Sequence, residues 1–381
     1  MRVLNVNSSL DLKGGGGTAE RTFQMSRFIS RLDVSCTVLT LDIDLDKGRV
    51  AAVSPAKVVA LPCVWRRFYV PALRWGTICR LVREADVVHL MGHWSVLNAM
   101  VYFVLRHMGK PYVVCPAGAL PLFGRSAWFK RLYNVVAGRS IIRNAAAWIA
   151  VTEGELPHFE AYGVPAQKVT VIPNGVCEAD FFMTSDLSLS ARYGWVEGPV
   201  ILFMGRLNPI KGPDLLLEAF ISVCKQLPDY QLVFAGPDGG MLPDLFASAQ
   251  AHGLGDRIHF LGHVDGEDKS RLYRRAALLV VPSRQEAMSI VALEAGICGT
   301  AVLLTDQCGF SDIRAVDPRL EVAATTAAIA AGLVRLLSDP GVLTQVAPIW
   351  KRFVSQHYAW ETMAPNYLTL YRNILARTLR S

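Results

Sequence analysis

The sequence has no uninterrupted run of 18 apolar residues, although hydrophobic residues make up 52% of its 381 positions. A helix that crosses a bilayer needs about 20 such residues, so we expect no transmembrane helix. The eight cysteines contain no Cys-x-x-Cys pair, which argues against a disulfide framework and against a zinc site. They are predicted to be reduced core thiols of a cytoplasmic protein: Cys36, Cys63, Cys79, Cys115, Cys177, Cys224, Cys298 and Cys308.

The usual phosphate-binding fingerprints are also missing. A run of four glycines at 14–17 follows a predicted first strand at 1–6, but it has neither the dinucleotide-binding spacing nor a Gly-Lys-Ser/Thr ending. We predict a loop here, followed by an amphipathic helix over about 19–32. Such a loop allows the backbone to approach a phosphate closely, and a merely flexible loop is the alternative.

Acidic residues are scarce between 61 and 143, where Glu84 and Asp86 stand against 12 Lys and Arg. Several of these cations alternate with Trp and Phe. A basic surface with aromatics suits an anionic membrane or a polyanionic acceptor, and a solvated basic face is the alternative. Nucleic acid is not expected as a partner, because no recognition motif accompanies the charge.

Apolar segments of strand length alternate with amphipathic helical segments along the chain, which indicates an α/β fold with parallel, doubly wound sheets. The length suggests two domains. In the first half, strands are predicted at 36–41, 57–61, 86–91, 111–115, 146–151 and 169–172, and helices at 73–84, 96–108, 128–144 and 153–162.

The most informative stretch is 281–296. It begins at the end of a predicted buried strand, 277–281, and continues through a Pro-Ser turn into an apolar helix. A helix terminus at the carboxyl end of a parallel sheet attracts phosphate. Glu286 lies in the turn and Glu294 eight residues later, a helical distance of about 12 Å. Glu294 is surrounded by apolar residues, so it needs a polar partner, and ribose hydroxyls would supply one. Two glutamates at this spacing also occur by chance in many helices.

Pro282-Ser283-x-x-Glu286, followed by seven residues and Glu294-Ala295, resembles the signature of retaining GT-B glycosyltransferases of family 4. The segment 205–212 is similar to the family's Gly-Arg-Leu…Lys-Gly, and it carries Arg206 and Lys211. Two cations near a helix start suit a diphosphate leaving group. The interdomain Pro-Asn-Gly-Val at 173–176 and the C-terminal helix also resemble the family.

The resemblance implies two Rossmann-like domains facing across a cleft, over 1–177 with a crossover helix at 362–381, and over 178–361. Catalytic roles are implied for Glu286, Arg206, Lys211 and His93. No metal is implied. Donor-binding roles are implied for Gly15, Gly16, Gly236, His263, Val264, Ala287, Met288, Ser289, Ile290 and Glu294.

Two segments depart from the family pattern. Relatives commonly place a histidine that contacts the donor sugar at the position of Ala117. In the segment 86–95 the family's second histidine is replaced by Met91, and His93 follows two residues later. Either His93 takes over from the neighbouring loop, or activity is reduced, or the donor sugar differs.

The expected function is therefore transfer of a sugar from a nucleotide sugar, UDP rather than GDP, to a glycan or lipid-linked acceptor with retention. No cofactor beyond the donor is implied. Cell-surface polysaccharide synthesis by a cytoplasmic protein, peripheral on the inner face of the membrane, is the expected setting. Two alternatives stay open: an impaired homologue that binds a nucleotide or a partner, and a nucleotide-sugar epimerase of similar fold.

Overall fold

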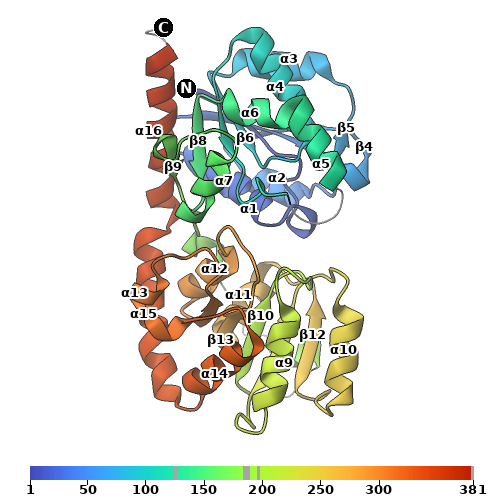
Figure 1. The fold of residues 1–381 in the computed structure, drawn as a ribbon, viewed down its shortest axis with the longest axis vertical. Helices are drawn as coiled ribbons and strands as arrows, with labels where there is room; N and C mark the ends of the chain where they lie inside the picture. Colours follow the sequence, from blue (N-terminus) through green and yellow to red (C-terminus); the bar gives the residue numbers. More distant parts are fainter. Residues whose placement is uncertain (123–126, 183–188, 195–197, 379–381) are drawn as a thin grey trace. The chain divides into compact units, whose positions relative to one another are not determined.

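The chain forms two compact units in the computed structural model, which describes residues 1–122, 127–182, 189–194 and 198–378. The first unit comprises Met1–Gly175 together with Trp360–Ser381, and the second comprises Val176–Ala359. Each unit is a parallel sheet with helices packed against it (Figure 1). The two parallel-sheet α/β domains expected from the sequence are thus confirmed.

The sheet of the first unit has seven parallel strands in the order β3-β2-β1-β6-β7-β8-β9. The strand order reverses between β1 and β6, which is where open α/β sheets bind ligands. All five residues of β6 are buried, as expected for a parallel strand covered on both faces. The strands are β1 (Arg2–Val6), β2 (Ser35–Leu41), β3 (Lys57–Leu61), β6 (Val87–Met91), β7 (Tyr112–Cys115), β8 (Ala147–Ala150) and β9 (Val169–Val171).

Helices and one small hairpin complete the first unit. The hairpin pairs β4 (Cys63–Trp65) with β5 (Val70–Pro71) in antiparallel fashion. The expected helix over 128–144 is interrupted, because a π-helical turn, Asn134–Gly138, separates α5 from α6. The helices are α1 (Leu12–Ile29), α2 (Lys47–Ala52), α3 (Trp75–Glu84), α4 (Val96–Met108), α5 (Ala127–Tyr133), α6 (Arg139–Arg143), α7 (Leu156–Glu160) and α16 (Trp360–Thr378).

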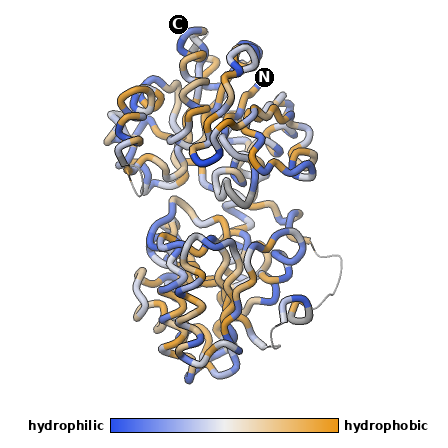
Figure 2. Tube along the Cα trace, turned by 90° about the vertical axis from the view of Figure 1, so that its right-hand side faces the viewer, coloured by the Kyte–Doolittle hydropathy of each residue, from blue (hydrophilic) through white to orange (hydrophobic). Residues whose placement is uncertain are grey.

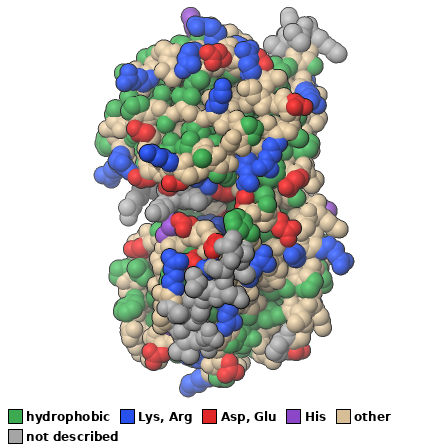
Figure 3. All heavy atoms as spheres, turned by 180° about the vertical axis from the view of Figure 1, so that it is seen from behind, with side chains coloured by type: hydrophobic (Ala, Val, Ile, Leu, Met, Phe, Trp, Pro, Cys, Tyr) green, Lys and Arg blue, Asp and Glu red, His purple; other side chains and the backbone are tan. Residues whose placement is uncertain are grey.

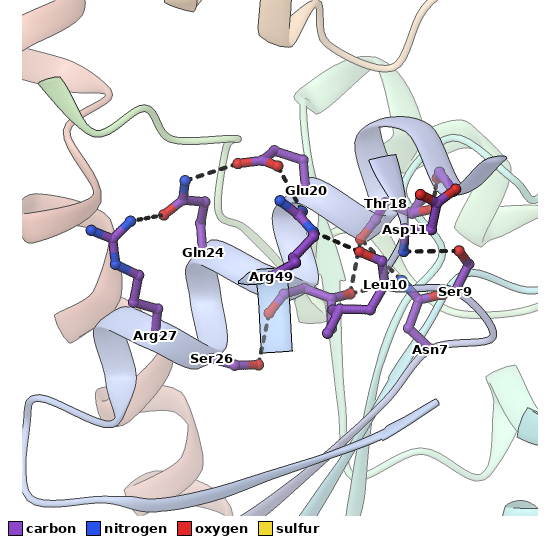
Figure 4. A network of polar contacts seen from close by, with 12 residues as sticks. Asn7, Ser9, Leu10, Asp11, Thr18, Glu20, Gln24, Ser26, Arg27 and Arg49 are labelled. Atoms are coloured by element: carbon purple, nitrogen blue, oxygen red, sulfur yellow. Dashed lines mark hydrogen bonds and ion pairs between the residues drawn. The ribbon is translucent and has the colours of Figure 1, made fainter. Parts of the chain in front are cut away.

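The glycine run is not the loop that the sequence predicted, because α1 begins at Leu12 and includes it. Only Gly16 leaves the helical conformation, with φ 55° and ψ −147°, and marks a kink. The kinked start is held from the side by Arg49, whose Nε donates to Leu10 O over 2.6 Å and whose Nη2 meets Glu20 Oε2 over 2.8 Å (Figure 4). Thr18 Oγ1 donates to Gly15 O over 3.1 Å.

The second unit has six parallel strands in the order β12-β11-β10-β13-β14-β15, with its reversal between β10 and β13. Hydrophobic residues gather along these strands (Figure 2). Phe234 on β11 packs between Phe203 and Phe260 of its neighbours, at ring distances of 5.4 and 5.1 Å. The strands are β10 (Val200–Met204), β11 (Gln231–Ala235), β12 (Ile258–Gly262), β13 (Ala276–Val281), β14 (Ala301–Thr305) and β15 (Glu321–Val322).

The helices of the second unit are α8 (Leu189–Tyr193), α9 (Pro213–Val223), α10 (Leu242–Ala251), α11 (Gly266–Arg275), α12 (Ile290–Cys298), α13 (Ile313–Val316), α14 (Thr326–Leu337) and α15 (Pro340–His357). Among the described residues no single helix has the length and apolarity to cross a bilayer. Only the pair Thr326–Leu337 and Gly341–His357 passes such a test together, with a bend of 104°.

The chain leaves and re-enters the first unit at neighbouring points. Val176 N donates to Tyr358 O over 2.8 Å, and Val176 forms a parallel bridge with Ala359. Trp360, only 1% exposed, packs against Gly175, where a Cβ would lie 2.9 Å from its ring. From there α16 packs along α1.

Candidate active site

An ion pair joins the two loops that leave β10 and β13 at the reversal of the second sheet. Lys211 Nζ lies 2.9 Å from Glu286 Oε1, and their side chains are 35% and 7% exposed. Lys211 therefore reaches the surface, whereas the carboxylate it contacts is almost enclosed. The two residues come from positions 75 apart in the chain, and the parallel sheet brings their loops together at one edge.

Backbone and side-chain contacts fix these two loops to each other. Gly212 has φ 65°, and a Cβ on it would collide with the carbonyl of Pro282. Arg284 N donates to Ile210 O over 2.8 Å, and the Arg284 guanidinium holds Asp214 through two bonds of 2.8 and 2.6 Å. Although burial would raise it, these contacts with Arg284 hold the pKa of the Asp214 carboxyl below its usual value.

The loop after β14 supports Glu286 from the other side. Ser283 Oγ donates to Glu286 Oε1, and Thr305 Oγ1 donates to Ser283 O over 2.6 Å. Glu286 N bonds Gln307 O over 2.9 Å. The carboxylate is thus oriented by a hydroxyl, a cation and its own backbone before any ligand contacts it.

The helix α12 begins later than the sequence suggested. The turn extends from Pro282 through Ser289, and Ile290 is the first helical residue. Ala287 and Met288 lie in this turn, and Met288 is buried. Ser289 is fully buried, and its Oγ has no hydrogen-bond partner among the described residues. Because the first N–H groups of a helix have no intrahelical partner, this terminus offers donors to an anion.

Glu294 lies one turn inside α12 and is only 5% exposed. Its Oε1 meets Lys269 Nζ over 2.7 Å, and its Oε2 accepts from Tyr273 OH over 2.6 Å. Lys269 and Tyr273 were missed by the sequence reasoning. Their spacing of four on α11 places them on one helical face, which was the available signal. Lys269 keeps 25% of its side chain exposed, so the cluster extends to the surface.

The remaining predicted residues of this unit follow the neighbouring strands. Arg206, half-buried, lies on the same loop as Lys211, and Gly239 provides the space for its side chain. Gly236 has φ 150°, a Cβ there would collide with the carbonyl of Gly205, and its N–H donates to Gly262 O over 2.6 Å. At the end of β12, His263 contacts Asp265 over 3.3 Å, and Val264 is buried.

His93 lies in a buried network of the first unit rather than on an open surface. It is 2% exposed, and its Nε2 donates to Asn134 Oδ1 over 3.0 Å. Asn134 Nδ2 in turn donates to Tyr162 OH over 2.9 Å, and the π-helical turn carries Asn134. Burial lowers the pKa of His93 to about 4. The geometry supports a neutral, structural imidazole, so His93 is not carried into the reaction proposed below.

Ala117, at the position of the family's histidine, adopts a left-handed conformation with φ 49°. The loop is anchored by Glu155, a buried residue whose carboxylate accepts from Gly118 N and, over 2.5 Å, from Val151 N. Glu155 thereby ties together the loops that leave the neighbouring strands β7 and β8. A non-glycine residue in this conformation costs about 1–2 kcal/mol.

Comparison with known proteins gives a consistent assignment for both units. The family described as "Glycosyl transferases group 1" matches residues 189–352, and the "Glycosyl transferase 4-like domain" matches residues 16–175. A D-inositol 3-phosphate glycosyltransferase of Salinispora tropica is 30% identical over 336 residues, covering 79% of this chain and 69% of that protein.

Two solved structures illustrate the shared fold. Sucrose-phosphate synthase from Thermosynechococcus elongatus superposes with a TM-score of 0.75 at 20% identity, covering 99% of this chain and 100% of that one. Anabaena HepE in complex with UDP and glucose also gives 0.75, at 18% identity, with 98% and 100% covered.

Proposed function

The chain belongs to the glycosyl transferases group 1, glycosyltransferase family 4, and from that premise we propose that it transfers a hexosyl group from a UDP-sugar with retention at the anomeric carbon. The observation that carries the proposal is the Lys211–Glu286 pair at 2.9 Å, which lies at the sheet reversal next to the start of α12. A cation, a carboxylate and unpaired helix N–H groups are the chemistry needed for a sugar diphosphate.

Each group has a distinct role in this proposal. Lys211 and Arg206 neutralise the charge that grows on the diphosphate as the glycosidic bond breaks. Glu286 accepts hydrogen bonds from the sugar hydroxyls and stabilises the positive charge of the oxocarbenium-like transition state. Glu294, positioned by Lys269 and Tyr273, accepts from the ribose hydroxyls. A carboxylate can accept about four hydrogen bonds, so its two protein contacts leave room for these.

The reaction needs no general base from the chain. The bond between the anomeric carbon and the phosphate oxygen breaks, and the acceptor oxygen bonds the anomeric carbon from the same face. The acceptor's proton moves to the departing phosphate oxygen. This route does not use an imidazole, which accounts for alanine at position 117. The charge of the leaving group rests on Lys211, Arg206 and the start of α12, so we propose that no metal is required.

The proposal of UDP is supported by the HepE complex, which holds UDP and glucose. We propose a glycan or lipid-linked acceptor in cell-surface polysaccharide synthesis, reached by a cytoplasmic protein that is peripheral on the membrane's inner face. The relative from Salinispora tropica, named for D-inositol 3-phosphate, is an example of a family member with a small anionic acceptor.

The test is incubation of the purified protein with labelled UDP- and GDP-sugars, with and without EDTA. We expect donor hydrolysis or transfer with a UDP-sugar, insensitive to EDTA and reduced at least about a hundredfold by Glu286→Gln. Lys351→Gln, which removes an exposed ion pair with Glu178 elsewhere in the same unit, is the matched control and should leave turnover unchanged.

Other outcomes would favour the alternatives. Tight nucleotide binding without turnover of any donor would indicate a binding protein, in line with Ala117. Release of a free epimerised sugar together with UDP would indicate an epimerase. Turnover that survives Glu286→Gln would contradict the assignment of the site.

A further inference from the structure

An apolar strip faces solvent on the helical segment of α5 and the π-helical turn that follows it. Its residues recur at the spacing of one helical face, yet they are exposed, with Val135 at 80% and Trp128 at 66%. The strip comprises Trp128, Phe129, Leu132, Val135 and Val136. In an ordinary globular helix this pattern faces the core.

The opposite face of the same segment is the one packed into the unit. Ala137, Ile141 and Ile142 are each no more than 3% exposed. Asn134 bonds His93 and Tyr162. The segment therefore has two apolar faces, and only one of them is buried in the described part of the chain.

The strip is continuous with the hairpin of β4 and β5, which lies beside α5 (Figure 1). Phe129 contacts Phe68 at a ring distance of 5.8 Å, and Phe68 contacts Trp65 at 4.7 Å. Val64 and Trp65 are exposed as well. We name the strip and these three hairpin side chains, with the cations between them, the aromatic–basic face. Contiguous exposed apolar side chains of this extent mark an interaction site.

The charge of this region has one sign. Between 61 and 143 there are 12 Lys and Arg against Glu84 and Asp86. Arg67, Arg131 and Arg139 are exposed next to the apolar side chains, whereas Arg66 is paired with Asp44 over 2.6 Å. Arg125 lies outside the described residues. Figure 3 shows the first unit from behind, where hydrophobic side chains lie among Lys, Arg, Asp and Glu.

We propose that the aromatic–basic face docks in the plane of an anionic bilayer surface, an inference that rests on the proposed function insofar as a lipid-linked acceptor is met there. Trp and Phe suit the boundary between headgroups and acyl chains, and an apolar helix face enters it by about 5–10 Å. Exposed arginines attract anionic headgroups. A second copy of the chain is a poorer occupant, because two such faces would bring like charges together.

The test is co-sedimentation of the full chain with vesicles of phosphatidylcholine, with and without phosphatidylglycerol, at low and high salt. We expect binding only to the anionic vesicles and weaker binding at high salt. Arg67→Glu combined with Arg131→Glu and Arg139→Glu should lower the partition coefficient about a hundredfold or more, because each basic residue near such a surface strengthens binding about fivefold. Trp128→Ser with Val135→Ser and Val136→Ser should lower it at least about tenfold.

Matched controls change equally exposed side chains elsewhere. Phe246→Ser on α10 and the pair Arg352→Glu and Arg372→Glu on α15 and α16 should leave binding unchanged. Absence of binding to anionic vesicles at any salt would overturn the inference. Equal losses of vesicle binding in the control variants would also overturn it. A dimer of the parent protein in analytical ultracentrifugation that becomes a monomer in the apolar variant would do the same, because the face would then be an interface between two copies.

UDP affinity measured without lipid separates this inference from the proposed function. Vesicle binding without UDP binding would contradict the proposed function and support the membrane-binding face. UDP binding without vesicle binding would contradict the membrane-binding face and support the proposed function. Urea denaturation of the variants shows whether the first unit, which carries the changed residues, is still folded.

Discussion

Lys211 Nζ and Glu286 Oε1 are 2.9 Å apart, so the cation assigned to the diphosphate and the carboxylate assigned to the sugar are partners of each other. A donor that binds here exchanges this contact for two of its own. Lys211 is partly exposed and can turn to the diphosphate, and Glu286 keeps Ser283 as a hydrogen-bond donor when it does.

The first prediction concerns this cation. Lys211→Met should lower kcat/KM for the donor by about a hundredfold or more, because it removes a charge that acts on the leaving group. Lys211→Arg should retain part of the activity. Steady-state kinetics would check both. The control is Lys351→Met, which removes an exposed pair with Glu178 at 3.6 Å. An effect of Lys351→Met as large as that of Lys211→Met would contradict the assignment.

The second prediction concerns Arg284 and Asp214, whose two bonds of 2.8 and 2.6 Å join the loop of Glu286 to the helix that follows Lys211. Arg284→Ala or Asp214→Ala should raise the KM of the donor about tenfold and cost about 1 kcal/mol of stability. In a double-mutant cycle the two changes should not be additive. Additive losses in KM would show that the pair does not position the loops.

The third prediction concerns the left-handed Ala117. Ala117→Gly should raise the free energy of unfolding by up to about 1 kcal/mol, because glycine adopts this conformation without the Cβ strain. Urea denaturation would measure it. Ala117→Val should destabilise instead, since a β-branched residue fits this conformation worse. Equal unfolding free energies of the parent protein, Ala117→Gly and Ala117→Val would contradict the left-handed conformation of residue 117.

The fourth prediction is a pH dependence. Burial lowers the pKa of His93 to about 4 and that of His89 to about 3, from an ordinary 6.5. Between the lowered pKa of the folded chain and the ordinary 6.5 of the unfolded chain, the unfolded chain binds more protons than the folded one. The free energy of unfolding is therefore greatest above pH 6.5 and falls as the pH drops toward 4. From its shift, His93 alone contributes about 3 kcal/mol, at about 1.4 kcal/mol per tenfold difference in proton affinity.

His93→Gln should therefore flatten the pH profile of the unfolding free energy between pH 6.5 and 4, as measured by urea denaturation. The exposed His252 is the control, and His252→Gln should leave the slope unchanged. An unchanged slope in His93→Gln would mean that this imidazole is protonated in the folded chain.

The sequence predicted best where local signals mark both ends of an element. Helix α4 begins and ends as expected, because Ser95 caps its start by accepting from Asn98 N over 3.1 Å and Gly109 closes it with φ 62°. The prediction of a loop at the glycine run was wrong because no local signal there marks the start of the helix. Glycine disfavours a helix by about 1 kcal/mol per residue but does not forbid one, and Arg49 and Thr18 hold this helical start through contacts that the local sequence does not indicate.

The site was predictable in its motifs but not in its supports. Glu286 and Lys211 lie in recognisable segments, and the parallel sheet explains why they meet. Lys269 and Tyr273 lie 25 and 21 positions before Glu294, and nothing local to Glu294 indicates them. The burial of His93 could not be foreseen either, because it depends on Asn134 and Tyr162 from two other elements.

The bridge between Val176 and Ala359 means that the whole second unit is a single insertion whose two ends are adjacent. A second unit from a related protein can therefore replace this one between residues 175 and 360, and the strand register of the first unit's sheet stays as it is. The proposed donor site, all of whose residues lie in the second unit, would then move with it, provided that the packing of Trp360 on Gly175 is kept.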